Sequence, residues 1–87
     1  MTNPQGIHRL TTSGIKFATA PGWYADGGGL YLEVNSNGRK RWALRLTCNG
    51  RRRDFGLGPI HKVSLQAARE MAAVYRAKAY QGIDPIA

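Results

Sequence analysis

Cysteine, histidine and acidic residues are scarce in this sequence of 87 residues. Its one cysteine, Cys48, cannot form an internal disulfide and leaves too few thiols for a cysteine-based zinc site. The two histidines, His8 and His61, are far apart in the sequence with no acidic cluster near them, whereas a metal site needs three or four converging ligands. We therefore expect neither a metal site nor a cofactor. A lone thiol is compatible with a reducing cytoplasm.

Long apolar runs and catalytic arrangements are missing as well. No stretch approaches the roughly 18 apolar residues of a membrane span, and residues 1–10 lack the apolar segment of a secretory signal. The acids are isolated, and no Ser/His/Asp or Cys/His set has a spacing typical of a catalytic site. The sequence therefore predicts a soluble intracellular protein that is not an enzyme in its own right.

Positive charge is what the sequence has in abundance. Thirteen Lys and Arg residues face five Asp and Glu residues, which gives a net charge of +8. Such an excess is typical of a domain that binds nucleic acid, and an anionic membrane surface is the other candidate partner. Seven of the basic residues lie close together with no acid among them: Arg39, Lys40, Arg41, Arg45, Arg51, Arg52 and Arg53.

This basic segment has the pattern of a folded strand and not of a disordered tail. Trp42, Leu44 and Leu46 alternate with polar residues over 41–47, and a period of two is typical of a half-buried β-strand. The shared phase of these three side chains places Trp42 in the core, so we do not expect it to stack on bases. The outward positions of the strand are Arg41, Ala43, Arg45 and Thr47.

Two neighbouring segments have the same alternation. Residues 30–34 and 52–57 each carry their apolar side chains on one face. Residues 35–38 (Asn-Ser-Asn-Gly) and 49–50 (Asn-Gly) are hairpin signals, the second because both of its residues tolerate the positive φ of a type I′ turn. The sequence therefore predicts a three-stranded antiparallel β-meander with one apolar face and one polar face.

Helices are expected on both sides of this meander in the sequence. Ser64 is a suitable N-cap for a helix over 65–80, which contains no glycine or proline, and Gly82 is a natural residue to follow its end. A short helix is predicted over 12–19, although Gly14 weakens it. The predicted fold class is α+β in the order α-β-β-β-α, with the C-terminal helix packed on the apolar face of the meander.

The segment 26–29 (Asp-Gly-Gly-Gly) is interpreted as a turn. Glycine loops that bind phosphates follow a strand and open a helix, and a P-loop also carries a lysine after its glycines. Here the glycines precede a predicted strand and no lysine follows them. We therefore expect no nucleotide site at this position.

The polar face of the meander is the candidate DNA-binding surface. The major groove of B-DNA admits a β-ribbon, and an arginine can pair both acceptors of a guanine edge. We therefore expect base or groove contacts from Arg41, Arg45 and Arg52. Tyr31 and Thr47 lie on the same predicted face and suit phosphate oxygens. Further phosphate contacts are expected from the basic residues beside the two turns: Arg39, Lys40, Arg51 and Arg53.

Two other interpretations of this face stay open. Exposed arginines on a sheet often serve only to keep a protein in solution, although seven without balancing acids make this reading weaker. Sheets that bind single-stranded RNA usually present two or three aromatic side chains for stacking. Only Tyr31 is expected on this face, which disfavours that mode of binding.

The sequence resembles, over about residues 10–85, the N-terminal arm-type DNA-binding domain of phage and genomic-island tyrosine recombinases (integrases). The resemblance implies a small sheet-plus-helix domain that binds arm-type sites in attachment DNA. It also implies that the catalytic residues belong to a later domain of the same chain, so none of them maps onto this sequence. The motifs that carry the resemblance are Leu10-Thr11, residues 26–32 (Asp-Gly-Gly-Gly-Leu-Tyr-Leu), Arg41-Trp42, Leu57-Gly58, Val63-Ser64-Leu65, Ala68-Arg69 and residues 82–85 (Gly-Ile-Asp-Pro).

The domain limits expected from this resemblance are a flexible leader over 1–9, the DNA-binding domain over 10–82, and over 83–87 the start of a linker to an absent core-binding and catalytic region. The predicted function is sequence-specific binding of double-stranded DNA at arm-type sites during site-specific recombination in the bacterial cytoplasm. The alternatives are a protein–protein module that contacts other integrase subunits or a directionality factor, and a non-specific nucleic-acid binder.

Overall fold

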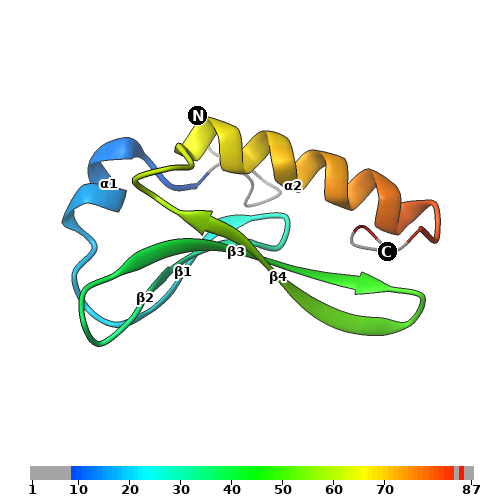
Figure 1. The fold of residues 1–87 in the computed structure, drawn as a ribbon, viewed down its shortest axis with the longest axis horizontal. Coiled ribbons are helices and arrows are strands. Elements are labelled where there is room, and N and C mark those ends of the chain that lie inside the picture. Colours follow the sequence, from blue (N-terminus) through cyan, green and yellow to red (C-terminus); the bar gives the residue numbers. More distant parts are fainter. Residues whose placement is uncertain (1–8, 84, 86–87) are drawn as a thin grey trace.

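Two helices and four strands make up the part of the chain that a computed structural model describes, residues 9–83 and 85 (Figure 1). The strands form one antiparallel sheet in the order β1-β2-β3-β4. The elements are α1 (Thr12–Phe17), β1 (Gly22–Gly27), β2 (Leu30–Val34), β3 (Lys40–Cys48), β4 (Arg51–Pro59) and α2 (Leu65–Tyr80).

The predicted meander is confirmed as strands β2 to β4. The bounds of β2 agree with the predicted strand, and β3 and β4 are longer than predicted by one or two residues at each end. Asn49 and Gly50 connect β3 to β4 with φ angles of 52° and 79°, the two positive values that a type I′ turn requires. The turn fixes the register of the hairpin, in which Thr47 pairs with Arg52 and Arg45 with Asp54.

The predicted strand count is wrong, because β1 adds a fourth strand to the sheet. Trp23 and Ala25 lie on one face of β1, while Tyr24 and Asp26 lie toward the helices. Asp26 is the extra residue of a β-bulge opposite β2, and a bulge redirects a side chain out of the regular alternation. Since a buried carboxylate occupies an inward position, the strand has no apolar face that sequence periodicity can detect.

Asp26 is held by an ion pair with helix α2 and is only 1% exposed. Its Oδ2 accepts from Arg69 Nε at 3.0 Å, and its Oδ1 accepts from Arg69 Nη2 at 2.9 Å and from the Leu10 amide at 2.8 Å. Arg69 Nη2 also donates to the Leu10 carbonyl at 2.9 Å. The hydrogen bonds that Arg69 donates to Asp26 raise the pKa of Arg69 above its ordinary value. Three segments distant in sequence are therefore joined at one buried carboxylate.

Helix α2 has the bounds that the sequence predicts. The Ser64 hydroxyl accepts from the Ala67 amide at 3.1 Å and caps the first turn. At the other end Gly82 has a φ of 80°, and the Ile83 amide donates to the Lys78 carbonyl at 2.8 Å. This pattern is a Schellman motif, which satisfies the last carbonyls of a helix.

Helix α1 is shorter than predicted, because it ends at Phe17 and not at residue 19. Thr11 caps its start by accepting from the Gly14 amide at 2.9 Å. Its C-terminal carbonyls bind a side chain from the sheet, since Lys40 Nζ donates to the carbonyls of Ile15 at 2.8 Å and Lys16 at 3.0 Å. A cation at a helix C-terminus interacts favourably with the helix dipole.

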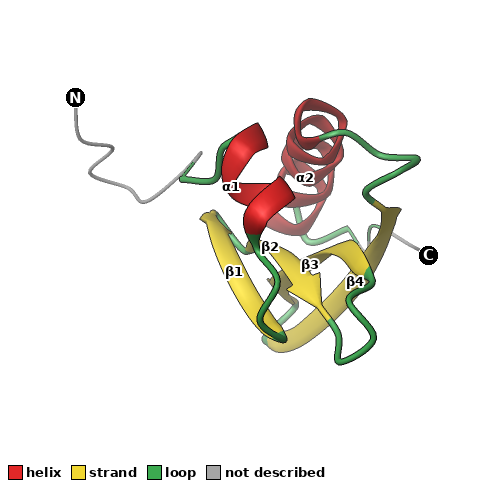
Figure 2. Ribbon diagram, turned by 90° about the vertical axis from the view of Figure 1, so that its left-hand side faces the viewer, coloured by secondary structure: helices red, strands yellow, loops and turns green. Residues whose placement is uncertain are grey.

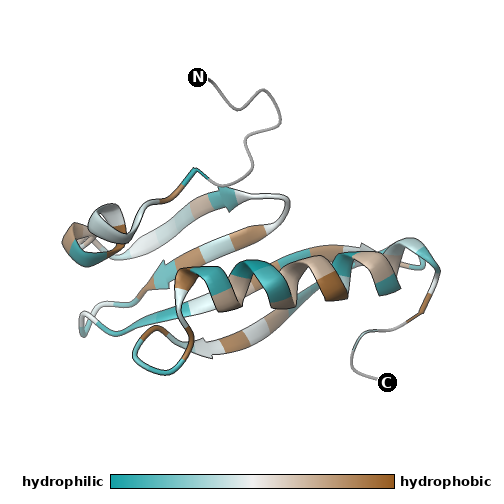
Figure 3. Ribbon diagram, turned by 90° about the horizontal axis from the view of Figure 1, so that it is seen from above, coloured by the Kyte–Doolittle hydropathy of each residue, from teal (hydrophilic) through white to brown (hydrophobic). Residues whose placement is uncertain are grey.

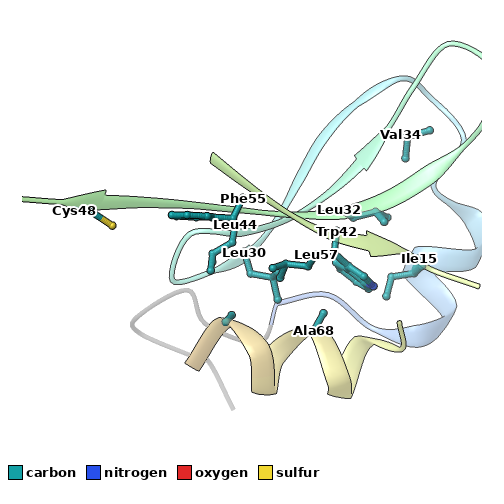
Figure 4. Close-up of a cluster of buried hydrophobic side chains, with 11 residues drawn as sticks. Ile15, Leu30, Leu32, Val34, Trp42, Leu44, Cys48, Phe55, Leu57 and Ala68 are labelled. Carbon is teal, nitrogen blue, oxygen red and sulfur yellow. The ribbon is translucent and has the colours of Figure 1, made fainter. Parts of the chain in front are cut away.

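The core lies between the sheet and the two helices, which occupy the same side of the sheet (Figure 2). Trp42 is fully buried at its centre, and its Nε1 donates to the Val63 carbonyl at 2.7 Å, so the β4–α2 connection is tied to β3. Helix α2 lies along the sheet (Figure 3) and packs closely because Ala68 and Ala72 face it. The side chains labelled in Figure 4 are Ile15, Leu30, Leu32, Val34, Trp42, Leu44, Cys48, Phe55, Leu57 and Ala68.

The turn predicted over 26–29 is confined to Gly28 and Gly29, because Asp26 and Gly27 belong to β1. Gly28 and Gly29 have φ angles of 63° and 89°. A Cβ on Gly29 would collide with the Arg45 carbonyl oxygen of the neighbouring strand, and the Arg45 amide donates to the Gly29 carbonyl at 2.7 Å. Arg76 of α2 donates to the Gly28 carbonyl at 3.0 Å. Close backbone approach therefore explains why a side chain is excluded here.

Two of the predicted segments fall mainly outside the described residues. Only Arg9 of the predicted leader 1–9, and only Ile83 and Pro85 of the predicted linker 83–87, are described. Within residues 9–83 no helix has the length and apolar character needed to cross a membrane. The same residues contain no group of three or more His, Cys, Asp and Glu side chains placed to hold a metal ion.

Candidate nucleic-acid interface

We call the face of the sheet that is turned away from α1 and α2 the outer face. Figures 1 and 2 show that no helix of the described chain covers it. Side chains alternate between the two faces of a strand, so the buried positions on each strand identify the outward ones. The outer face consists of Trp23, Ala25, Tyr31, Glu33, Arg41, Ala43, Arg45, Thr47, Arg52, Asp54 and Gly56.

Arg45 lies at the centre of an aromatic cluster on this face. Its Cζ is 4.8 Å from the ring centre of Trp23 and 5.9 Å from that of Tyr31. The two rings contact each other edge to face, with their centres 5.3 Å apart. A guanidinium over an aromatic ring is attracted to it, most strongly for Trp. Aromatic residues from β1 and β2 therefore hold this arginine of β3 against the sheet.

Asp54 holds the same guanidinium from the side. Arg45 Nε donates to Asp54 Oδ1 at 2.9 Å, and Nη2 donates to Oδ2 at 3.3 Å. This hydrogen bonding lowers the pKa of Asp54 and raises the pKa of Arg45. The pKa of Asp54 is lower in the folded chain than in the unfolded chain. The pair therefore stabilises the fold at pH values above the unfolded-state pKa, and this stabilisation is lost as the pH falls through the folded-state pKa. Both groups are charged at neutral pH.

Arg41 has a looser environment at the other end of β3. Its Nε donates to Glu33 Oε1 at 2.9 Å, and 62% of its side chain is exposed, against 33% for Arg45. A groove beside the β2–β3 turn brings Arg41 close to Arg39, which is exposed. The groove is lined by Glu33, Asn35, Arg39, Lys40, Arg41, Gly56, Gly58 and Pro59.

Thr47 and Arg52 form an exposed pair near the tip of the β3–β4 hairpin. They are cross-strand neighbours in the sheet register, and both lie on the outer face. The hairpin therefore carries Arg52, Thr47 and Arg45 in succession along one surface. This placement agrees with the prediction that these residues share a face with Tyr31 and Arg41.

The structure separates the remaining predicted residues from the outer face. Arg51 and Arg53 have the phase of Phe55 and therefore lie on the helix side of β4, where Arg53 Cζ is 5.2 Å from the Phe55 ring centre. Lys40 directs its ammonium to the end of α1. The nine predicted residues are thus divided between the outer face (Tyr31, Arg41, Arg45, Thr47, Arg52), the helix side (Arg51, Arg53) and the β2–β3 end (Arg39, Lys40).

Sequence reasoning missed Trp23 as a member of the outer face, and it missed the pairing of Glu33 and Asp54 with the arginines of this face. Trp23 is 40% exposed and lies against Arg45. Glu33 and Asp54 pair with two of the three outer-face arginines, so this face is less positive than the linear run of charges implies. The Asn-Gly turn did contain a signal for one pair, because a two-residue turn fixes the register that places Arg45 opposite Asp54.

Comparison with known proteins gives consistent matches. Residues 10–87 match the model of a family described as "Arm DNA-binding domain". The chain is 39% identical over 61 residues to an integrase of Shigella phage Sf6 and to prophage integrase IntS of Escherichia coli, and 38% identical over 65 residues to an integrase of Enterobacteria phage P4. The matches cover 70% of this chain but only 16%, 16% and 14% of those relatives.

Proposed function

Since this chain belongs to the arm DNA-binding domain family, we propose that it binds arm-type sites in attachment DNA as a non-catalytic module of a phage-like integrase. The outer face is the proposed contact surface, and double-stranded DNA in the bacterial cytoplasm is the proposed partner. Sequence specificity comes from the side chains that reach base edges, while the surrounding cations bind phosphates without reading sequence.

The observation that carries this proposal is a sheet face without a covering element that presents arginines on adjacent strands. Arg41, Arg45 and Arg52 lie on this face, next to Tyr31 and Thr47. The width of the major groove accommodates two strands, and its base edges offer acceptors to arginine. The β3–β4 hairpin is therefore the element proposed to enter the groove, with Arg41, Arg45 and Arg52 directed to bases or groove walls.

The residues around the outer face are proposed to bind phosphates. Arg39 is exposed beside the β2–β3 turn, and Arg51 lies beside the β3–β4 turn. Arg53 lies on the helix side of the same hairpin, so its proposed phosphate contact lies outside the outer face. Lys40 already donates to two carbonyls of α1, so its proposed phosphate contact uses the one N–H of its ammonium that those bonds leave.

Two measurements test the proposal. Selection of bound duplexes from a random-sequence pool is expected to enrich a common site. Affinity for that site is then expected to fall by about 10²- to 10³-fold between 50 and 200 mM salt, because about 4–6 phosphate contacts release counterions. A scrambled duplex of the same length, measured by fluorescence anisotropy, is the control and should bind more weakly at both salt concentrations.

Other outcomes identify the alternatives. Equal affinity for selected and scrambled duplexes would mean a non-specific nucleic-acid binder. Absence of binding at the lower salt concentration would contradict the proposal and favour a protein interface with another integrase subunit or a directionality factor. Such an interface, with an apolar centre, responds far less to salt.

A further inference from the structure

We propose that Asp54 is a positioning residue that holds Arg45 in the orientation needed to read one guanine in the major groove. The inference rests on the proposed function and adds a specific base and a specific role to it. Asp54 is acidic and lies on a face proposed to bind DNA, so its proposed role is to improve discrimination between base sequences and not to increase affinity.

The geometry of the pair determines which donors remain. Asp54 accepts from Nε and from one N–H of Nη2, so two of the five N–H groups of Arg45 are used. The adjacent, terminal edge of the guanidinium keeps one N–H on Nη1 and one on Nη2, pointing in parallel. Guanine presents O6 and N7 as two adjacent acceptors in the major groove, and arginine pairs with both of them at once. The free edge of Arg45 therefore matches guanine and no other base.

The aromatic rings hold the plane of the same group. The guanidinium lies against Trp23 on β1 and Tyr31 on β2 while Asp54 on β4 holds its edge. Side chains as long as arginine lose considerable rotamer freedom when they are fixed in a complex. Here that freedom is already restricted in the free protein. The bidentate contact with a base is therefore formed by a preorganised side chain, which sharpens discrimination.

Electrostatics indicates that the role of Asp54 is specificity. Half of its side chain is exposed on the outer face, where a carboxylate repels phosphates of any sequence. A group that lowers affinity for all DNA while orienting one base-reading donor increases the difference between correct and incorrect sites. Arg41 and Glu33 form the matched comparison, because that pair has one hydrogen bond and a more exposed arginine with no aromatic contact in the described structure.

The test compares Asp54→Asn with Glu33→Gln on the selected duplex, on a scrambled duplex and on duplexes with single base changes. Asp54→Asn is expected to bind scrambled DNA more tightly than the wild-type chain does. At one G·C pair, the preference of Asp54→Asn for the correct base pair over a substituted one should fall by about 5- to 100-fold, the range that corresponds to one bidentate contact. Arg45→Ala should lose discrimination at the same pair, and adding Asp54→Asn to Arg45→Ala should cause no further loss there. Glu33→Gln should leave discrimination at that pair unchanged.

A readout on the free protein separates positioning from general stability. The Nε–H signal of Arg45 in a proton–nitrogen NMR spectrum should be resolved from the other arginine signals in the wild-type chain and should merge with them in Asp54→Asn. The melting temperature should fall no further than it does in Glu33→Gln, which breaks the other exposed ion pair of this face. If Asp54→Asn changed the affinity for selected and scrambled DNA equally, the inference would be overturned. It would also be overturned if Asp54→Asn lost discrimination at a base pair that Arg45→Ala does not affect. Failure of the proposed function is distinguishable, because the wild-type chain itself would then show no preferred duplex.

Discussion

Replacing Asp26 with alanine is expected to lower the free energy of unfolding by about 3–5 kcal/mol. The carboxylate is 1% exposed, and it is bound by Arg69 from α2 and by the Leu10 amide. Its removal leaves the partly buried guanidinium of Arg69, whose side chain is 19% exposed, without its counter-charge, and it leaves the Leu10 amide without its acceptor. A domain of this length has roughly 4–13 kcal/mol of stability, so the loss is a large share of the total and should clearly lower the midpoint of unfolding. Urea unfolding followed by circular dichroism measures the change.

A matched surface pair provides the control. Glu33→Ala removes the partner of Arg41, and exposed pairs contribute about 0–1 kcal/mol. The double variant with Asp26→Leu and Arg69→Met should recover much of the loss, because an apolar pair of similar volume does not leave a buried charge. A loss at Asp26→Ala no larger than that at Glu33→Ala would contradict the account of how β1 is attached to α2.

Trp42→Ala is expected to have a comparably large effect, about 3–5 kcal/mol of lost stability. The indole is fully buried at the centre of the core, and its Nε1 donates to the Val63 carbonyl at 2.7 Å. The substitution therefore opens a cavity under β3 and also releases the connection between β4 and α2. Thermal unfolding followed by far-ultraviolet circular dichroism measures the loss of stability. DNA binding of the variant is measured below its melting temperature.

Trp23 gives the comparison for the outer face. Trp23→Ala should change stability by only about 1 kcal/mol, since it removes a partly exposed ring and its contacts with Tyr31 and Arg45. Its effect should instead appear in DNA affinity at the selected site. If Trp23→Ala were as destabilising as Trp42→Ala, the division of the two tryptophans between the outer face and the core would be wrong.

The parts of the fold that the sequence predicted are those specified by local physical rules. The large apolar side chains of β2 to β4 recur at every second position, and the Asn49-Gly50 turn sets the pairing of β3 with β4. Helix α2 has a cap at Ser64 and a glycine beyond its end. Strand β1 escaped prediction because one of its inward residues, Asp26, is polar and is stabilised by partners that are 43 and 16 residues away in the sequence. An ion pair between residues far apart in the sequence does not appear in the alternation of apolar and polar residues that predicts a strand.

The same distinction between local and long-range contacts applies to the candidate site. The phase of β3 placed Arg41, Arg45 and Thr47 correctly on one face. Counting charges along the chain could not anticipate that Glu33 and Asp54 lie across the strands from two of these arginines. Lys40 bonds to the end of α1, a contact set by how that helix folds back on the sheet. Ala43 was expected to be outward and exposed, but it is buried between its cross-strand neighbours Tyr31 and Gly56.

The central claim is that the outer face of the sheet binds duplex DNA, and a chemical-shift titration tests it most directly. The 15N-labelled chain is titrated with the selected duplex and, separately, with a scrambled duplex at the same salt concentration. The account predicts that the largest shifts fall on outer-face residues of β1 to β4, including the Trp23 indole and the Arg45 side chain, while the outward side of α2 stays unchanged. Shifts concentrated on α2 with the outer face unaffected would contradict it.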